Sequence, residues 1–498
     1  MTPSATRTRP LRERLLSRRG AVAVGGALAL VMLAVIVPGF ENDPYTLQRF
    51  HSRPDLRPPQ IEVAKGHAIG PGYVFVAPKN GPGPAGPMIL DRRGRVVWFK
   101  HLPKGIQAFD FKPQRYRGRP VLTWWEGHSA KGNGAGEDVI ADSSYRQIAR
   151  IKMRRGYRAD LHEFALTRRG TALVLVYNAV PRDLSSVGGP RHGKAVEGVI
   201  QELDVKTGRV RFEWHSLAHV ALAESYKKVP DDKSDAYDYF HINSVREEQN
   251  GNLLVSARHT NAVYEIDRRT GRVLWRLGGK RSTFAMGPGT RFVAQHDARR
   301  GPGSTVSVFD NQAPPDSDHE SRVVLIQIDP RTRRARLAHE YKHRHDVHSD
   351  SQGSAQFLPS GDVFVGWGGK SPWFSEYTLA GRTLFDARFL GKGTNSYRSF
   401  LLPWRGTPRR RPAVDVQRRG RRVVVWASWN GATELASWEV LGGRRPRPLR
   451  SVAVSRRTGF ETRIVLRRPP RFLVVRALDR AGKPLRRSRL VRVPLRRG

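Results

Sequence analysis

The stretch VYEIDRRTGRVLWRL, residues 263–277, decides the fold, because the chain repeats it. Alternating apolar residues flank a turn that begins at Asp267 and ends in Gly271-Arg272, a pattern typical of a β-hairpin. The other copies are MILDRRGRVVWF (88–99), VIADSSYRQIARI (139–151), IQELDVKTGRVRFEW (200–214), IQIDPRTRRARLAHEY (326–341) and EYTLAGRTLFDARF (376–389). The chain therefore contains six versions of one hairpin.

The Asp that leads the turn recurs at a nearly constant period. Asp91, Asp142, Asp204, Asp267 and Asp329 lie 51, 62, 63 and 62 residues apart, and the sixth copy has no Asp. Strongly apolar strands such as TALVLVYN, from residue 171, run between the hairpins, so each unit holds about four strands. Units of this size cannot bury their own faces alone, which is the pattern of a propeller. We expect an all-β fold with a six-bladed β-propeller over residues 60–404.

The N-terminal end has the pattern of a membrane anchor. Residues 1–20 carry six Arg and one Glu, and residues 21–38 are uncharged and apolar, at the lower length limit of a membrane span. We interpret 1–20 as a cytoplasmic basic segment, 21–38 as a transmembrane signal anchor and 39–59 as a linker. The alternative is a cleaved secretory signal. We expect a single-pass protein of the cell membrane with its bulk extracytoplasmic.

A second domain follows the repeats. Residues 405–411 are rich in Pro and Arg and are interpreted as a linker. Residues 412–498 contain short alternating strands spaced as in a seven-stranded sandwich, with Trp438 as its buried aromatic residue. We expect a fibronectin type III-like β-sandwich.

Composition limits the chemistry and the partners. The chain has no Cys, which excludes disulfides, a thiol nucleophile and iron–sulfur clusters. Its formal net charge of +44 favours anionic partners. The Arg residues are scattered over turns and strand edges, without a recognition helix or RNA-binding signature, so we expect no nucleic-acid partner. An anionic cell-envelope polymer is the better candidate.

The histidines recur at one position of the repeat. His162, His241 and His296 each stand just ahead of the first strand of a successive unit. Because the innermost strands of a propeller converge, these imidazoles should face one another. Arg258, at the end of NLLVSAR, adds a fixed cation to the same place. His259 should point away from it, since neighbours alternate on a strand.

Three more residues are candidates for substrate binding. Asn243 is two residues from His241 and so can share its face, His348 lies slightly earlier in the next unit, and Trp125 can line a pocket for an aromatic ring. The cluster of histidines with Arg258 suits a sulfuryl or phosphoryl group. Arg and His donors hold its peripheral oxygens, while one neutral His attacks the central atom.

Other interpretations of these residues stay open. Each His is also compatible with a structural role, and three His form the ligand set of many zinc sites. No carboxylate or paired spacing accompanies the three, so we expect no metal and no cofactor. The run HRHDVH, residues 343–348, can chelate a metal but is more typical of a solvated loop, and a lone Trp is more often core.

Several segments resemble the bacterial arylsulfate sulfotransferase (arylsulfotransferase) family. They are the long stretch from DYFHINSV to RLGG (238–279), QHDARR (295–300), LTWWEG (122–127) and GSAQFLPSGDVFVGWG (353–368). The resemblance covers about residues 60–404. The segment SWNGATELASWEVL (428–441) is similar to the sandwich appended to many actinobacterial-type members.

The resemblance implies a six-bladed propeller that moves a sulfuryl group from an aryl sulfate donor, a phenolic sulfate ester, to a phenolic acceptor. It implies a ping-pong mechanism through a sulfohistidine, without a nucleotide sulfate donor. By motif His296 is the nucleophile, and His162, His241 and Arg258 hold the sulfuryl oxygens and assist the leaving phenol. The chain lacks the Cys pair of several periplasmic relatives.

Two other functions are alternatives to a sulfotransferase. The charge and the appended sandwich favour a non-catalytic, membrane-anchored propeller that binds an anionic cell-envelope polymer. A quinone-cofactor dehydrogenase is less compatible, because such propellers usually have eight Trp-rich blades and an acidic calcium site.

Overall fold

The computed structural model describes residues 46–495 except 69, 131, 233 and 316. These residues form an all-β protein whose helices are three single 3₁₀ turns, η2 (Ser185–Val187), η3 (Ser216–Ala218) and η4 (Leu222–Glu224). The segments predicted as basic end and transmembrane anchor, 1–20 and 21–38, lie outside the described residues. Within the described part, no helix has the length and apolar character needed to cross a membrane.

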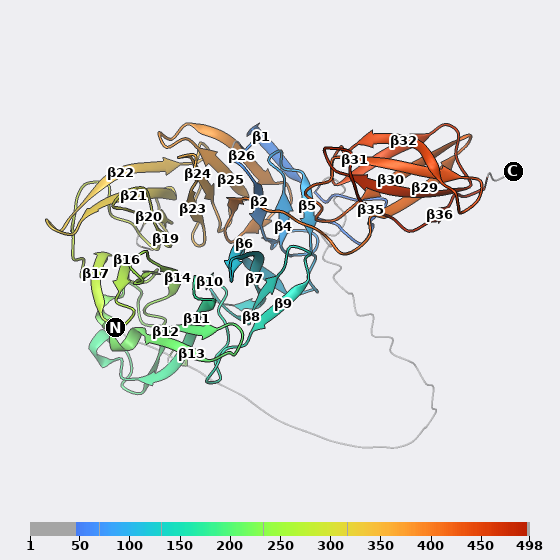
Figure 1. Ribbon diagram of the computed structural model, residues 1–498. Coiled ribbons are helices and arrows are strands. Elements are labelled where there is room, and N and C mark those ends of the chain that lie inside the picture. Colours follow the sequence, from blue (N-terminus) through green and yellow to red (C-terminus); the bar gives the residue numbers. More distant parts are fainter. Residues whose placement is uncertain (1–45, 69, 131, 233, 316, 496–498) are drawn as a thin grey trace, which may run out of the picture. The chain divides into compact units, whose positions relative to one another are not determined.

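Six sheets, each with four main antiparallel strands, follow one another along the chain and lie around a common centre in a propeller-like arrangement (Figure 1). The first three, in order across each sheet, are β28 (Phe400–Leu402), β2 (Tyr73–Val76), β4 (Met88–Leu90), β5 (Val96–Phe99); β6 (Gln107–Tyr116), β7 (Arg119–Ala130), β8 (Asn133–Ala141), β9 (Gln147–Ile151); and β10 (Phe164–Leu166), β11 (Thr171–Arg182), β12 (Gly193–Asp204), β13 (Val210–His215).

Two of the remaining three sheets carry an additional edge strand. The strands are β14 (Ile242–Glu247), β15 (Leu253–Ala257), β16 (Ala262–Ile266), β17 (Val273–Gly278); β19 (His296–Arg300), β20 (Thr305–Asp310), β21 (Arg322–Asp329), β22 (Arg334–Lys342), β18 (Ala285–Met286); and β23 (Ser354–Phe357), β24 (Val363–Gly366), β25 (Trp373–Tyr377), β26 (Thr383–Phe389), β1 (Ile61–Gly66). A short ladder, β3 (Pro78–Lys79) with β27 (Asn395–Ser396), completes this region.

The six predicted hairpins are confirmed as the outer strand pairs of these sheets, from β4–β5 to β25–β26. Their Asp residues explain why the repeat is visible. Oδ1 of Asp204 accepts the backbone N–H groups of Lys206 and Thr207, and Oδ1 of Asp267 accepts those of Arg269 and Thr270. Each carboxylate thus fixes its own turn by a local side-chain to backbone bond.

The two ends of the repeat region meet in the first sheet. β28, at the end of the region, pairs with β2 near its start, with Phe400 opposite Phe75. β1 is an outer strand on the sixth sheet, where Ile61 lies opposite Phe389. Residues more than 300 positions apart therefore belong to one sheet, which joins the first and last units.

Apolar residues of neighbouring sheets pack face to face. Leu175 of β11 and Val255 of β15 belong to one buried cluster, and Trp125 of β7 shares another with Phe164 of β10. This is the burial that a single sheet cannot achieve alone. It holds the inner ends of the sheets in fixed positions.

Residues 413–492 form a two-sheet sandwich. One sheet contains β29 (Ala413–Arg419), β30 (Arg422–Ser428) and β33 (Glu461–Leu466), and the other contains β32 (Arg450–Arg456), β31 (Ser437–Gly443), β34 (Phe472–Leu478), β35 (Pro484–Arg487) and β36 (Val491–Arg492). Trp438 is buried between them with Val425 and Val475. The fibronectin type III-like class stays a prediction.

Part of the predicted linker 39–59 packs on the sandwich. Phe50 lies on Phe460, with ring centroids 4.3 Å apart, and Ser52 donates a hydrogen bond to Glu461. The side chain of Asn430 bonds both the N–H and the carbonyl of Phe99, at 3.0 and 2.9 Å. The segment before the repeat region and β5 of its first sheet therefore both contact the sandwich.

Candidate active site

A cavity of about 420 Å³ lies where the inner ends of the sheets converge. The residues that matter most in its lining are His162, His241, Arg258, His259, His296 and Tyr397. The loops before β10 and β14 supply His162 and His241, β19 begins at His296, and Arg258 follows β15. The structure thus brings together the four residues that the sequence singles out for catalysis.

The imidazole ring of His162 lies close to the rings of both His241 and His296. The ring centroid of His162 is 5.2 Å from that of His241 and 6.2 Å from that of His296. The ring of Tyr397 lies 5.8 Å from His162 and 6.5 Å from His296. One small group in the cavity is therefore able to meet several of these side chains.

Backbone distortions aim the inner strands at this point. Asp110, His241 and Asp297 all have positive φ, of 52°, 54° and 55°, which is uncommon for residues other than Gly. In β6, β14 and β19 the strand register shifts beside these residues, as in a β-bulge. Bulges are frequent next to active sites, where they redirect a side chain.

Two of the imidazoles are held by carboxylates. Nδ1 of His162 lies 2.5 Å from Oδ1 of Asp160, and Nδ1 of His241 lies 2.5 Å from Oδ2 of Asp238. Burial, with smaller contributions from His162 and Arg258, holds the pKa of His241 well below its usual range. Burial raises the pKa of Asp238.

His296 has a different partner. Its Nδ1 lies 2.8 Å from Oδ1 of Asn311, and its Nε2 accepts the backbone N–H of Gln352 at 3.3 Å. Burial and then the charge of Arg258 hold the pKa of His296 well below its usual range. The ring is therefore neutral near pH 7, the state in which an imidazole is a nucleophile.

Arg258 is the cation of this cluster. Its Nη1 donates to the carbonyl of Ala294 at 3.2 Å, which anchors the guanidinium beside His296. His259 also lines the cavity, with its ring centroid 4.5 Å from that of His241, so the prediction that it points away was wrong. The alternation does not apply because β15 ends at Ala257 and both residues lie in the following turn.

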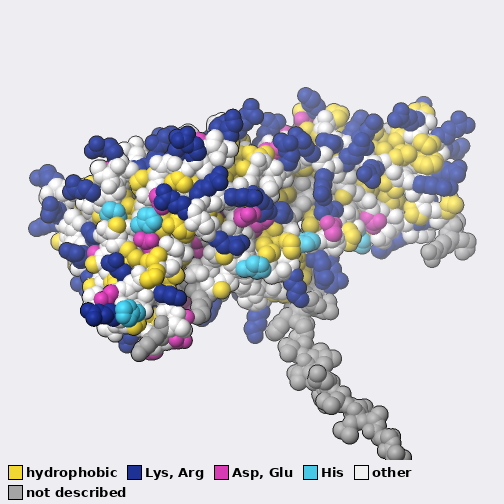
Figure 2. All heavy atoms as spheres, turned by 90° about the horizontal axis from the view of Figure 1, so that it is seen from below, with side chains coloured by type: hydrophobic (Ala, Val, Ile, Leu, Met, Phe, Trp, Pro, Cys, Tyr) yellow, Lys and Arg dark blue, Asp and Glu magenta, His cyan; other side chains and the backbone are white. Residues whose placement is uncertain are grey.

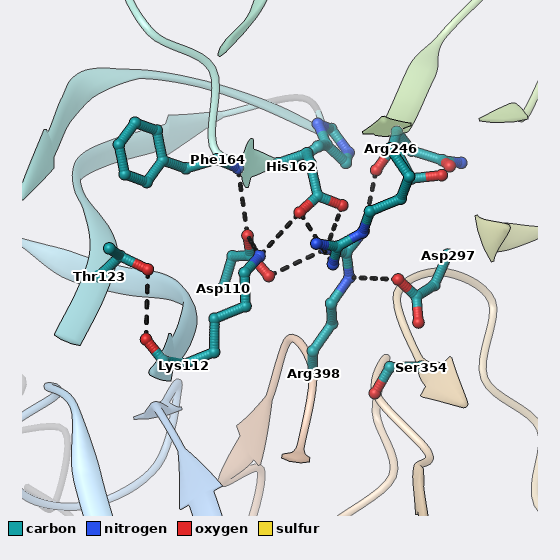
Figure 3. A network of polar contacts seen from close by, with 12 residues as sticks. Asp110, Lys112, Thr123, His162, Phe164, Arg246, Asp297, Ser354 and Arg398 are labelled. Atoms are coloured by element: carbon teal, nitrogen blue, oxygen red, sulfur yellow. Dashed lines mark hydrogen bonds and ion pairs between the residues drawn. The ribbon is translucent and has the colours of Figure 1, made fainter. Parts of the chain in front are cut away.

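A buried ionic network lies next to His162 (Figure 3). Arg398 bonds Asp110 at 2.9 Å and Glu163 at 2.7 Å, and its Nε is 3.4 Å from Asp297. Lys112 bonds Glu163 at 2.7 Å. Glu163 follows His162 in the chain, and Asp297 follows His296, so the network fixes the backbone that carries two of the catalytic candidates.

The network favours the charged forms of Glu163 and Arg398. Burial alone raises the pKa of Glu163, but Arg246, Arg398 and Lys112 bring it well below the usual range. Burial lowers the pKa of Arg398, and the Asp297 and Glu163 charges outweigh that effect and raise it well above the usual range. Buried charges need such pairing, because an uncompensated ion in the interior is strongly unfavourable.

The three residues proposed from sequence for substrate binding are not in the cavity lining. Nδ2 of Asn243 instead donates to the carbonyl of Gln295 at 2.7 Å, because the bulge at Ile242–Ser244 breaks the expected alternation. His348 is exposed in the loop before β23. Trp125 is 1% exposed and bonds the carbonyl of Ala159, so it is a core residue.

Sequence reasoning missed several residues of the site. Asp160 and Asp238 lie two and three positions before their histidines, a local signal that was readable. Gln352 and Tyr397 come from other units, and Asn311 follows β20 in the unit of His296 but 15 residues further along the chain, so none of them gave such a signal. Lys79 of β3 also lines the cavity, 3% exposed, with Nζ 2.5 Å from Oδ1 of Asn395, and burial lowers its pKa to about 7.

Among the described residues, one group has the spacing of metal ligands, namely Asp238, His241 and His259. Both rings already use Nδ1 in bonds to Asp238, His241 to its carboxylate and His259 to its backbone carbonyl at 2.6 Å. We therefore describe this group as a hydrogen-bonded cluster.

Fold and site define an all-β, propeller-like protein with histidines and an arginine at the centre of the ring. The chain belongs to the arylsulfotransferase (ASST) family, whose model matches residues 112–390. This range contains His162, His241, Arg258 and His296. No protein among the curated ones matches the chain.

Solved structures resemble the chain only distantly. A protein of unknown function from Bacteroides caccae has 14% identity and a TM-score of 0.40, with 66% of this chain and 98% of that one covered. A protein from Lactobacillus plantarum has 11% identity and a TM-score of 0.35, covering 85% and 97%. Virginiamycin B lyase from Staphylococcus aureus has 8% identity and a TM-score of 0.31, covering 74% and 96%. These values support no argument about function.

Proposed function

We propose that this protein transfers a sulfuryl group from an aryl sulfate ester to a phenol through a sulfohistidine on His296, without a nucleotide sulfate donor. The observation that carries the proposal is the meeting of a neutral His296 with His162, His241 and Arg258 on one cavity. Membership of the arylsulfotransferase family supports this class of activity.

In the first half-reaction, Nε2 of His296 attacks the sulfur atom of the donor. An S–N bond forms and the bond from sulfur to the aryl oxygen breaks, with the electron pair leaving on that oxygen. The oxygen takes a proton from Nε2 of His162, whose Nδ1 is held by Asp160. Arg258 and His241 stabilise the negative charge on the sulfuryl oxygens.

In the second half-reaction a phenol replaces the departed one. Its oxygen attacks sulfur, the S–N bond breaks, and the electron pair returns to Nε2 of His296. The phenolic proton moves to Nε2 of His162, which restores the starting state. The same histidine serves as acid and then as base because both phenol oxygens occupy the position opposite His296.

The test uses the full-length chain with 4-nitrophenyl sulfate and phenol. We expect release of 4-nitrophenol that increases with phenol, and a loss of about 10³-fold or more in His296→Ala. Mass spectrometry after exposure to donor alone should find an adduct of about 80 Da on the peptide containing His296, as covalent catalysis requires. Equal release by wild type and His296→Ala would contradict the proposal.

Binding of an anionic cell-envelope polymer is a second candidate. It is favoured by the net charge of +44 and by Lys and Arg side chains spread over the face seen in Figure 2. Retention of the full-length chain on a polyanion should weaken as salt increases and should not change in His296→Ala. Salt-independent retention would exclude this electrostatic mode.

We also propose the finer architecture and the location. Residues 60–404 are described as a six-bladed propeller and 412–498 as a fibronectin type III-like sandwich, the latter supported by its division into sheets of three and five strands. The protein is proposed to lie outside the cytoplasm, anchored by residues 21–38. Recovery of the full-length chain in the soluble cytoplasmic fraction would contradict this location.

A further inference from the structure

Asn311 is a buried amide whose polar atoms are all used. It follows β20 directly and is 1% exposed. Its Nδ2 donates to the carbonyl oxygens of Ser349, at 2.7 Å, and Gln352, at 3.0 Å. Its Oδ1 then faces Nδ1 of His296 at 2.8 Å.

These contacts fix the orientation of the amide. An amide rotated by 180° would place its oxygen against two carbonyl oxygens, none of which has a proton to donate. It would also direct NH₂ at the imidazole. The two backbone carbonyls therefore force the oxygen of Asn311, which only accepts hydrogen bonds, toward His296.

The orientation of the amide sets the tautomer of the imidazole. Since Oδ1 accepts, Nδ1 of His296 must carry the proton, and in a neutral ring the lone pair is then on Nε2. The backbone N–H of Gln352 gives independent support, because it lies 3.3 Å from Nε2 and donates to it. Both contacts require the same tautomer.

The other two histidines lack this arrangement. His162 and His241 have carboxylates at Nδ1, which attract any positive charge on the ring, although burial still holds the pKa of His241 well below its usual range. A neutral amide orients the ring with much less of this attraction. Asn311 thus distinguishes His296 from its two neighbours in the cavity.

We propose that Asn311 is a positioning residue that keeps the lone pair of His296 on Nε2 for attack on sulfur, an inference that rests on the proposed function. Nε2 leaves its contact with the N–H of Gln352 and forms the S–N bond, while the bond from sulfur to the aryl oxygen breaks. Nδ1 keeps its proton throughout. Its bond to Asn311 strengthens as the ring gains positive charge.

The first experiment measures the tautomer in the unmodified full-length chain. Imidazole ¹⁵N resonances, with His296 assigned by their loss in His296→Gln, should show a protonated Nδ1 and an unprotonated Nε2 at pH 7.5. The opposite tautomer would overturn the proposal. This measurement needs no turnover, so it is decided separately from the sulfotransferase activity.

The second experiment uses Asn311→Asp and Asn311→Leu. Asn311→Asp places a carboxylate at Nδ1, so the acid limb of the profile of kcat against pH should move upward by about one unit or more. Asn311→Leu removes the acceptor, and kcat should fall about 10²–10⁴-fold with little change in KM, as when a catalytic histidine loses its orienting partner.

The matched control is Ser321→Ala. The hydroxyl of Ser321 donates to the backbone carbonyl of Asn311 at 2.9 Å and accepts the N–H of Ser349 at 2.7 Å, so it supports the same loops without touching the amide side chain. This variant should lower thermal stability and leave the pH profile in place. The same pH shift in Ser321→Ala as in Asn311→Asp, or an unchanged kcat in Asn311→Leu, would refute a positioning role.

Discussion

The rings of His162 and His296 lie nearly parallel, with centroids 6.2 Å apart and an interplanar angle of 28°. They belong to different sheets, and the sheet that begins at β14 lies between these two in the chain. Each is followed by an acidic residue of the Arg398 network, so the same ion pairs hold both backbones. The two rings line the same cavity but differ in the partner of Nδ1, which is a carboxylate for His162 and an amide oxygen for His296.

The carboxylate of Asp160 should matter most for poor leaving groups. In Asp160→Asn the imidazole of His162 loses its carboxylate partner, and kcat should fall about 10²-fold or more. The loss should grow as the phenol becomes less acidic, because such phenols need the proton more. Rates for a series of substituted aryl sulfates measure this dependence. An equal loss across the series would contradict the acid–base role of His162.

Activity should persist below the usual pKa of histidine. Because the pKa of His296 is held well below its usual range, the nucleophile stays neutral when pH falls through about 6.5. We expect kcat/KM to be nearly constant from about pH 7.5 to 6 and to fall at lower pH. A half-maximal rate at or above pH 6.5 would contradict this account of the nucleophile.

The free energy of unfolding should also depend on pH in this range. The pKa values of His241, His259 and His296 are all lowered by burial, so the unfolded chain binds more protons than the folded one below about pH 6.5. The free energy of unfolding should therefore decrease as pH falls. Urea titrations at each pH separate this loss from the titration of the nucleophile.

Lys79 should affect stability in the same direction but at higher pH. Its folded pKa of about 7 lies below the 10.5 of an ordinary lysine, so between these values the unfolded chain carries the additional proton. The free energy of unfolding should rise with pH over this range, by at most about 1.4 kcal/mol per unit from this group. Urea unfolding of Lys79→Met should show a smaller rise. An unchanged slope would mean that Lys79 is charged in the folded protein.

Removal of Arg398 should strongly destabilise the folded protein. Arg398→Met leaves Asp110, Glu163 and Asp297 with less compensation in a region that is 0% exposed, and we expect a loss of about 3–5 kcal/mol of stability. Arg398→Lys should rescue little, since a single ammonium cannot reach the several partners of a guanidinium. Denaturant midpoints measure both, and a loss below about 1 kcal/mol would contradict the role of the network.

The sequence allowed the repeat and the histidine cluster to be predicted because both are encoded locally. Asp204 and Asp267 bond their own turns, so the hairpin signal is complete within five residues. His162, His241 and His296 were found because one position recurs in successive units. Asp160 has the same local character, although it was overlooked.

The remaining parts depend on contacts between residues that are not close in sequence. Asn311 meets His296 across the β19–β20 pair, and Asn243 lies outside the cavity lining because a bulge breaks the alternation of the strand. Trp125 was indistinguishable in sequence from a pocket residue, and only its burial of 99% assigns it to the core. The alternation of side chains along one strand does not show which of them reach the cavity and which are buried in the core.

The pairing of β28 with β2 sets an order for biosynthesis. Tyr397 and Arg398 stand just before β28, so the aromatic wall of the cavity and the central guanidinium are synthesised only after the sequence of all six hairpins. Until then Asp110, Glu163 and Asp297 lack the guanidinium that lies against all three, and the first sheet lacks its innermost strand. A nascent chain that stops before residue 398 therefore has every histidine of the cluster but not the side chain that ties the segment of His162 to that of His296.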